Sequence, residues 1–288
     1  MMRFLFVLSL CGDRTTDDEG RNSPAFSHYS HDKILPFQIV SPRGLMRYGL
    51  FSDVHSNLEA MTAVAKAMKA EGAEEFLCLG DFVGYYSNPI EVIELIESLN
   101  CWKLVLGNHD AACIGKTPLS KFNAPAAEAI QWTKARLKPK HYQFLQNLRL
   151  HEEIGEIQLV HASPFQSEEW HYLTQKEDVE RNFRYFQGFI CFFGHVHKPY
   201  IAEQKPDGSV EILEAQEHTL QKDCRYLVNV GSVGQPRDGN PQTCYVMYDS
   251  NSKKLSIRRI DYDYQTTVKK TLEAGLPEYL AQRLKTGK

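Results

Sequence analysis

The residues with the clearest chemical potential are carboxylates, imidazoles and one amide that each follow a short apolar run. Five successive runs end in this way, the last of them in "FICFFGHVH", with two histidines at alternate positions. In open α/β sheets, ligands bind outside the carboxyl ends of the strands, so five such ends can converge on one place. The residues concerned are, in chain order, Asp53, His55, Asp81, Asn108, His109, Asp110, His161, His195 and His197.

These donor types indicate a pair of divalent metal ions. Imidazole, carboxylate and amide ligands without a thiolate suit Mn, Fe, Zn, Co or Ni. Two ions about 3.5–4 Å apart can clamp a phosphoryl group and generate hydroxide at neutral pH. Because two neighbouring cations repel each other, an anionic group must lie between them, and Asp81 is the candidate. His195 and His197 lie about 7 Å apart along a strand, a spacing that suits approach to an ion pair from two sides.

Buried strands and helices must position these residues. Apolar runs at 48–51, 76–79, 103–106, 157–160, 189–193, 226–230 and 244–248 predict strands by their length and their bounding Gly, Asp and Asn residues. Helices are predicted over 56–72, with Ser56 and Glu59 as a capping box, and over 88–100, with Pro89 in its first turn. This alternation predicts a largely parallel first half of the chain. The second half is rich in turns, which favours antiparallel pairing.

Three segments fall outside this alternation. Residues 111–150 predict a helical insertion of two helices broken near Pro139, which either caps the site or covers one face of the sheet. A C-terminal helix is predicted near 277–286, begun by Pro277. We interpret residues 1–45 as an N-terminal extension, either disordered or a product of start-site choice, and residues 46–288 as a single domain.

The composition excludes several classes of protein. The chain has 288 residues and a formal net charge of −3 without a basic stripe, so we expect no nucleic acid partner. Its apolar runs fall short of the roughly 18 residues that a membrane span needs. Seven scattered cysteines without a C-x-x-C pair predict reduced thiols and a cytoplasmic protein. Whether the chain forms a homo-oligomer stays open.

Taken together, "DVH", "GD", "GNHD", a single histidine and "GHVH" resemble the calcineurin-like metallophosphoesterase superfamily, and the likeness spans about residues 46–262. The resemblance implies an α/β (α+β) fold, a four-layer α/β/β/α sandwich of two mixed sheets known as the metallo-dependent phosphatase fold. It also implies a hydrolase that cleaves a small phosphoester by attack of a metal-bridging hydroxide. The implied cofactors are two divalent ions, with Mn expected first and Fe, Zn, Ni or Co as alternatives.

The resemblance further implies a role for each residue of the set. The first ion would be bound by Asp53, His55 and His197. The second ion would be bound by Asn108, His161 and His195. Asp81 would bridge both ions, and His109 would protonate the leaving oxygen or stabilise charge there. Asp110 would orient His109 and raise its pKa.

Other residues bear on the substrate. Ser/Thr phosphoprotein phosphatases and dinucleoside tetraphosphate hydrolases carry an arginine shortly after G-D, whereas "GDFVGYYSNP" has none. Its absence favours a phosphodiester, and a phosphomonoester stays open. In "GSVGQPRDG", Arg237 and Ser232 are candidates for substrate binding, because phosphate sites favour arginine. Aromatic residues near the motifs either stack a nucleobase or belong to the core and rim; they are Tyr85, Tyr86, Phe165, Trp170 and Tyr172.

Two other functions compete with a small-molecule phosphoesterase. A non-catalytic binding or scaffold module on the same fold would be expected to lose metal ligands, and here all of them are present. A nuclease of the same superfamily would bind DNA or RNA in a salt-dependent way.

Overall fold

Two six-stranded sheets form the centre of the protein, which the computed structural model describes from residue 46 to residue 288. The predicted extension, residues 1–45, lies outside the described residues. The first sheet has the order β3 (Lys103–Leu104), β2 (Glu75–Cys78), β1 (Arg47–Phe51), β11 (Thr243–Asp249), β12 (Lys254–Ile260) and β9 (Glu217–Thr219). The second has the order β4 (His151–Ile154), β5 (Ile157–Val160), β6 (Ile190–Phe193), β10 (Arg225–Asn229), β7 (Tyr200–Gln204) and β8 (Val210–Leu213).

Both sheets are mixed, as expected. In the first sheet, β1, β2 and β3 pair in parallel, and β11 then pairs antiparallel with β1. In the second, β5, β6 and β10 pair in parallel, with antiparallel β4 and β7 on either side. The parallel strands therefore bring the predicted site residues, which follow β1, β2, β5 and β6, to the same end of the two sheets.

Side-chain alternation along the strands divides the core into layers. In β6, Ile190 and Phe192 pack with residues of the first sheet, and the Phe192 ring lies 5.6 Å from that of Tyr248. Cys191 and Phe193 belong to the apolar cluster on the opposite face. Successive residues of a strand point to opposite faces, so this continuous apolar run serves two cores at once.

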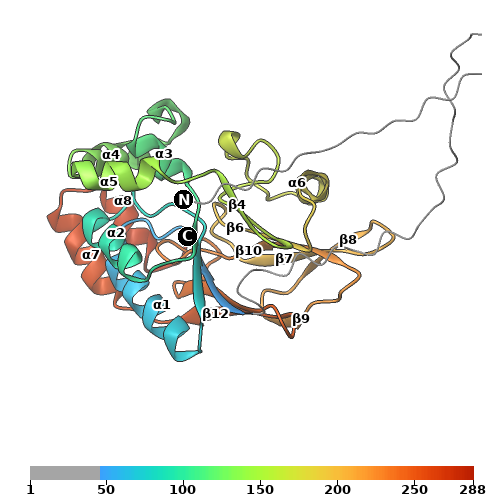
Figure 1. The fold of residues 1–288 in the computed structure, drawn as a ribbon. Coiled ribbons are helices and arrows are strands. Elements are labelled where there is room, and N and C mark those ends of the chain that lie inside the picture. Colours follow the sequence, from blue (N-terminus) through green and yellow to red (C-terminus); the bar gives the residue numbers. More distant parts are fainter. Residues whose placement is uncertain (1–45) are drawn as a thin grey trace, which may run out of the picture. The chain divides into compact units, whose positions relative to one another are not determined.

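Helices cover the two outer faces. The apolar side of α1 (Leu58–Ala70) and of α2 (Pro89–Ser98) packs on the first sheet, and α7 (Tyr264–Glu273) lies against α1. The helix α6 (Lys176–Asn182) and the short 3-10 helix η3 (Phe183–Tyr185) pack on the second sheet. Figure 1 shows these helices on either side of the sheets. The fold is thus the four-layer α/β/β/α sandwich.

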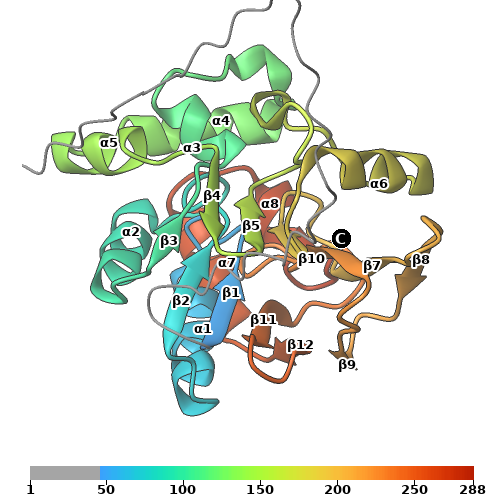
Figure 2. The same cartoon turned by 45° about the vertical axis from the view of Figure 1, so that its right-hand side comes forward.

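A third group of helices lies at one end of the sheets (Figure 2). It comprises α3 (Asn108–Cys113), the 3-10 helix η1 (Leu119–Lys121), α4 (Ala124–Lys134) and α5 (Pro139–Gln146). Phe144 contacts Phe82 in the loop after β2, with ring centroids 5.5 Å apart, and the Phe122 ring lies 5.0 Å from that of His109. Ile130 and Leu145 also belong to the apolar cluster of the first sheet, so residues 111–150 both border the candidate site and cover part of that sheet.

Local details refine the predicted helix ends. Helix α1 begins one residue later than the predicted capping box, because the side chain of Asn57, not Ser56, accepts the hydrogen bond from the Ala60 N–H. Helix α8 (Glu278–Arg283) lies within the range predicted near the C-terminus. The described cysteines are free thiols. Over residues 46–288, the helices lack the length and apolar character that crossing a membrane requires.

Candidate metal centre

The strand ends turn sharply into the candidate site through left-handed backbone conformations. The residues concerned have φ between 50° and 63°: they are Asp53, His55, Asp81, His195 and His197. Such angles are unfavourable for residues other than glycine and are concentrated at functional sites. Backbone hydrogen bonds from Asp53 to Gly80 (3.0 Å) and from His55 to Asp81 (2.9 Å) join the loops after β1 and β2 and hold this geometry.

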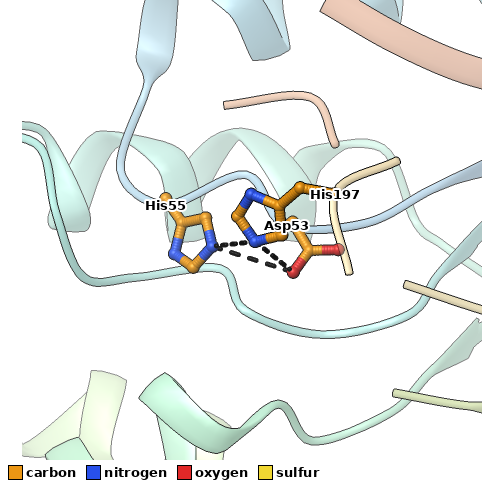
Figure 3. Close-up of side chains that lie close together, drawn as sticks. All are labelled: Asp53, His55 and His197. Carbon is orange, nitrogen blue, oxygen red and sulfur yellow. Dashed lines mark hydrogen bonds and ion pairs between the residues drawn. The ribbon is translucent and has the colours of Figure 1, made fainter. Parts of the chain in front are cut away.

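The first group of converging side chains is Asp53, His55 and His197, shown in Figure 3. Asp53 Oδ1 lies 3.0 Å from His197 Nε2 and 3.7 Å from His55 Nε2. The two imidazole nitrogens lie 3.1 Å from each other. All three side chains are buried. The group offers one oxygen and two nitrogens to a single point, which is a ligand set for a transition metal ion.

The second group is Asp81, His161 and His195, joined by the amide of Asn108. His161 Nε2 lies 3.4 Å from Asp81 Oδ2 and 3.0 Å from Asn108 Oδ1. The same Asp81 Oδ2 lies 3.6 Å from His55 Nε2 in the first group. Asp81 therefore lies between the two groups, where a shared ligand of two ions would be required.

Backbone carbonyl oxygens determine which histidine nitrogen faces the centre. Nδ1 lies 3.2 Å from the Val83 carbonyl oxygen in His55, 2.6 Å from that of Gln235 in His197 and 2.6 Å from that of Leu79 in His161. A carbonyl oxygen only accepts hydrogen bonds, so these Nδ1 atoms carry the proton in the neutral rings. The Nε2 lone pairs then point into the centre, which is the arrangement of metal-binding histidines.

Several buried polar atoms in the centre lack a partner, and they test whether metal ions would fit. Among the described residues, Asp53 Oδ1 and His195 Nε2 are buried without a hydrogen bond. Buried polar atoms are otherwise almost always satisfied, so such orphans need a ligand. Glycines allow the close approach: a Cβ at Gly107 would lie 2.1 Å from Asp81 Oδ1, and one at Gly194 would lie 2.3 Å from Asp53 Oδ2. The residues present fit divalent cations.

The electrostatics of the centre also favour cations. Burial would raise the pKa of Asp81, but the neighbouring His161 and His109 outweigh it and hold this pKa below its usual value. Burial lowers the pKa of His195 and of His197 to about 3. In His161, burial would lower the pKa, but the neighbouring Asp81 and Asp53 together outweigh it and raise the pKa to about 9. The carboxylates and the neutral imidazoles of His195 and His197 therefore provide negative charge and lone pairs together.

His109 borders the centre, but its predicted partnership with Asp110 is wrong. The Asp110 carboxylate accepts hydrogen bonds from the backbone N–H groups of Asp81 (2.8 Å), Val83 (3.2 Å) and Gly107 (3.1 Å). His109 Nδ1 is buried without a partner among the described residues. Burial also lowers the pKa of His109 instead of raising it. Asp110 shapes the two loops that carry Asp81 and His109.

The two residues predicted for substrate binding differ in their surroundings. Ser232 is fully buried, and its hydroxyl donates to the Asp53 carbonyl (2.9 Å) and accepts from the Gln235 N–H (2.8 Å). The single hydrogen of the hydroxyl is therefore used within the protein and is not available to a phosphoryl oxygen, so these contacts give the predicted role of Ser232 no support. Arg237 lies at the rim, where Nη2 donates to Tyr85 Oη (3.1 Å) and to Gln235 Oε1 (2.8 Å). Within residues 46–288, no carboxylate forms an ion pair with Arg237.

The aromatic residues near the motifs differ in how far they are buried. Tyr85, Tyr86 and Trp170 are buried, whereas Tyr172 has 53% of its surface exposed. The Tyr85 ring lies 4.5 Å from the rings of both His55 and His109, so it forms a wall of the centre.

The carbonyls of Leu79, Val83 and Gln235 are functional groups that the sequence does not reveal. Backbone oxygens have no residue identity, so no residue type in the sequence signals any of the three.

Comparison with known proteins gives consistent matches. The model of the calcineurin-like phosphoesterase superfamily domain matches residues 46–253. An uncharacterized protein of Methanocaldococcus jannaschii is 40% identical over 243 residues, which cover 83% of this chain and 97% of that protein. The crystal structure of a metallophosphoesterase from Sphaerobacter thermophilus is 33% identical with a TM-score of 0.75, covering 85% of this chain and all of that one. A hypothetical protein of Pyrococcus horikoshii shares the fold at 20% identity and a TM-score of 0.68, over 84% of this chain and 98% of its own.

Proposed function

Because the chain belongs to the calcineurin-like phosphoesterase superfamily, we propose that it is a dinuclear metal-dependent phosphoesterase that hydrolyses small phosphodiesters. The observation that supports this most strongly is the place of Asp81 Oδ2, between His55 Nε2 at 3.6 Å and His161 Nε2 at 3.4 Å. One carboxylate oxygen lies within reach of two ligand groups, which a mononuclear site would not need.

In this proposal, the residues divide into two ligand sets. The first ion would be held by Asp53, His55 and His197. The second ion would be held by Asn108, His161 and His195. Asp81 would contribute to both. When bound, the two ions, with Mn²⁺ expected first, supply Lewis-acid chemistry toward the phosphoryl oxygens and lower the pKa of water.

Protein side chains around the two sets would handle the rest of the reaction. A Cβ at Gly84 would lie 2.5 Å from His109 Nδ1, so this nitrogen faces the backbone and Nε2 is the atom that can donate a proton to the leaving oxygen. Next to Tyr85, the charged guanidinium of Arg237 donates to protein groups through Nε and Nη2, which leaves Nη1 to hold a phosphoryl oxygen. A single arginine suits the single negative charge of a phosphodiester.

A substrate panel on the Mn-loaded full chain tests the proposal. It comprises an aryl phosphodiester, an aryl phosphomonoester, cyclic nucleotides, and single- and double-stranded nucleic acid. We expect hydrolysis of the diester that a chelator abolishes and added Mn²⁺ restores. His55→Ala should lose this activity, and the exposed His151→Ala should retain it. A metal-loaded chain that hydrolyses none of these substrates would instead support the scaffold alternative.

A further inference from the structure

Tyr172 is an exposed aromatic side chain beside a proposed metal ligand. It has 53% of its surface exposed, and its ring centroid lies 4.0 Å from that of His195, which is 3% exposed. The phenol therefore lies against the imidazole at an angle of 35°, with about half of its surface left exposed to solvent. Exposed tyrosines are common on protein surfaces and need no explanation by themselves. What distinguishes Tyr172 is its position over the candidate metal centre.

The chain on both sides of Tyr172 is anchored. Trp170 is buried, its Nε1 donates to Thr117 Oγ1 (3.2 Å) in the loop between α3 and η1, and its ring lies 5.9 Å from that of His161. Leu173 is fully buried, and its carbonyl accepts a hydrogen bond from Tyr200 Oη (2.8 Å) in β7. Tyr172 is thus held open to solvent by a fixed loop, so little entropy is lost when a ligand packs on it.

The position of Tyr172 relative to His109, the proposed general acid, indicates which part of a substrate Tyr172 would contact. His109 lies on the side of Tyr85 and His55, with ring centroids 4.5 Å and 4.7 Å away. Tyr172 covers His195, which belongs to the other ligand set. A leaving group that departs toward His109 therefore leaves the second substituent of a diester on the side of Tyr172. The Arg237 guanidinium donates to Tyr85 Oη (3.1 Å), and its charge also acts on the phenol of Tyr172, so it lies near both tyrosines.

We propose that Tyr172 determines substrate specificity by stacking a planar ring, such as a nucleobase, carried by the non-leaving substituent of a phosphodiester. This rests on the proposed phosphodiesterase function and specifies its substrate as a nucleoside-type diester. Stacking between a base and an aromatic side chain is sequence-tolerant and contributes through ring area, so any nucleobase would bind.

Two diesters with the same leaving group test this inference: thymidine para-nitrophenyl phosphate and methyl para-nitrophenyl phosphate. In both, the bond to para-nitrophenolate breaks and water adds to phosphorus, so the two esters differ only in the non-leaving substituent, which is a nucleoside in one and a methyl group in the other. We expect Tyr172→Ala to lower kcat/KM for the thymidine ester about 5- to 100-fold, the usual range for loss of one base stack, and to change the methyl ester less than about 2-fold. Tyr172→Phe should retain the preference, since it keeps the ring.

The matched control is Tyr279→Ala, which removes a tyrosine of similar exposure (54%) from α8 and should leave both rates unchanged. An equal loss on both esters in Tyr172→Ala would overturn the inference, because Tyr172 would then support His195 and not the substrate. Equal rates of the wild-type chain on the two esters, with no effect of Tyr172→Ala, would also overturn it. Both results would leave the proposed phosphoesterase intact, since metal-dependent hydrolysis of the methyl ester tests that separately.

Discussion

His55 Nε2 and His197 Nε2 lie 3.1 Å apart, although 142 residues separate them in the chain. Each ring uses its Nδ1 for a backbone carbonyl, of Val83 in one case and of Gln235 in the other. With both Nδ1 atoms used in this way, the two Nε2 atoms can lie this close only when a cation, either a shared proton or a metal ion, lies between them. The nearby Asp53 carboxylate adds an oxygen donor at the same point, which favours a metal ion.

Replacement of the central carboxylate should remove both metal ions together. Asp81→Asn keeps the shape of the side chain but removes the negative charge that balances two cations. We expect tight binding of both ions and the hydrolytic activity to be lost, as measured by metal analysis after gel filtration. The control is the exposed Asp207→Asn. Retention of one full equivalent of metal would show that Asp81 belongs to a single ion.

His109→Ala should separate metal binding from turnover. The ring lies next to His55 and Asp81 and could itself reach an ion in that group. If His109 donates a proton, the variant keeps both ions and loses about 10²–10⁴ in kcat, the usual contribution of general acid–base catalysis. Metal content and kcat are measured on the same preparation, with His151→Ala as the control. Loss of an ion would reassign His109 as a ligand.

Asp110 should affect stability more than catalysis. Asp110→Ala would leave the buried N–H groups of Asp81, Val83 and Gly107 without their acceptor. Each unsatisfied group costs about 1–3 kcal/mol. We therefore expect a fall in Tm of at least roughly 6 °C, measured by calorimetry, and a smaller fall in Asp110→Asn, which retains one acceptor oxygen.

The exposed Asp207→Ala is the control for Asp110 and should change stability by less than about 0.5 kcal/mol. An unchanged Tm in Asp110→Ala with reduced kcat would restore the discarded role of Asp110 as the partner of His109.

A methyl group added at Gly194 should weaken metal binding, because it would displace a side chain of the centre. The Cβ of Gly194→Ala would lie 2.1 Å from Ser52 Oγ and 2.3 Å from Asp53 Oδ2, so the carboxylate must move. We expect at least a tenfold weaker affinity for one ion, measured by titration calorimetry. Gly208→Ala is the control: it has open space around its Cβ and a left-handed φ of 85°, so it carries backbone strain without contact to the centre. Equal affinities in the two variants would contradict this role for Gly194.

The sequence predicted the site well where a metal-binding residue type directly follows an apolar run that indicates a strand. Asp53, Asp81 and His195 each follow an apolar run at a strand end, and parallel strands necessarily bring such ends together. The strands β1, β2, β5, β6, β10 and β11 all overlap their predicted runs. Apolar periodicity and metal-binding residue types are properties of single residues, so they can be recognised in the sequence.

Other features depend on contacts that no local pattern encodes. Helix α7 was not predicted, because its buried residues are Thr267 and Thr271 and not an apolar stripe. Thr267 Oγ1 instead donates to Asn57 Oδ1 (3.0 Å), next to the loop after β1. The error over Asp110 has a similar origin: adjacency to His109 in sequence suggested a pair, but the first turn of a helix points successive side chains in different directions.

The most direct test of the central proposal is the anomalous scattering of Mn²⁺ in crystals of the metal-loaded chain. We predict two peaks. One lies among Asp53, His55 and His197, the other lies among Asn108, His161 and His195, and the Asp81 carboxylate lies between them. A single peak at full occupancy, or a pair of peaks without Asp81 between them, would contradict the dinuclear centre.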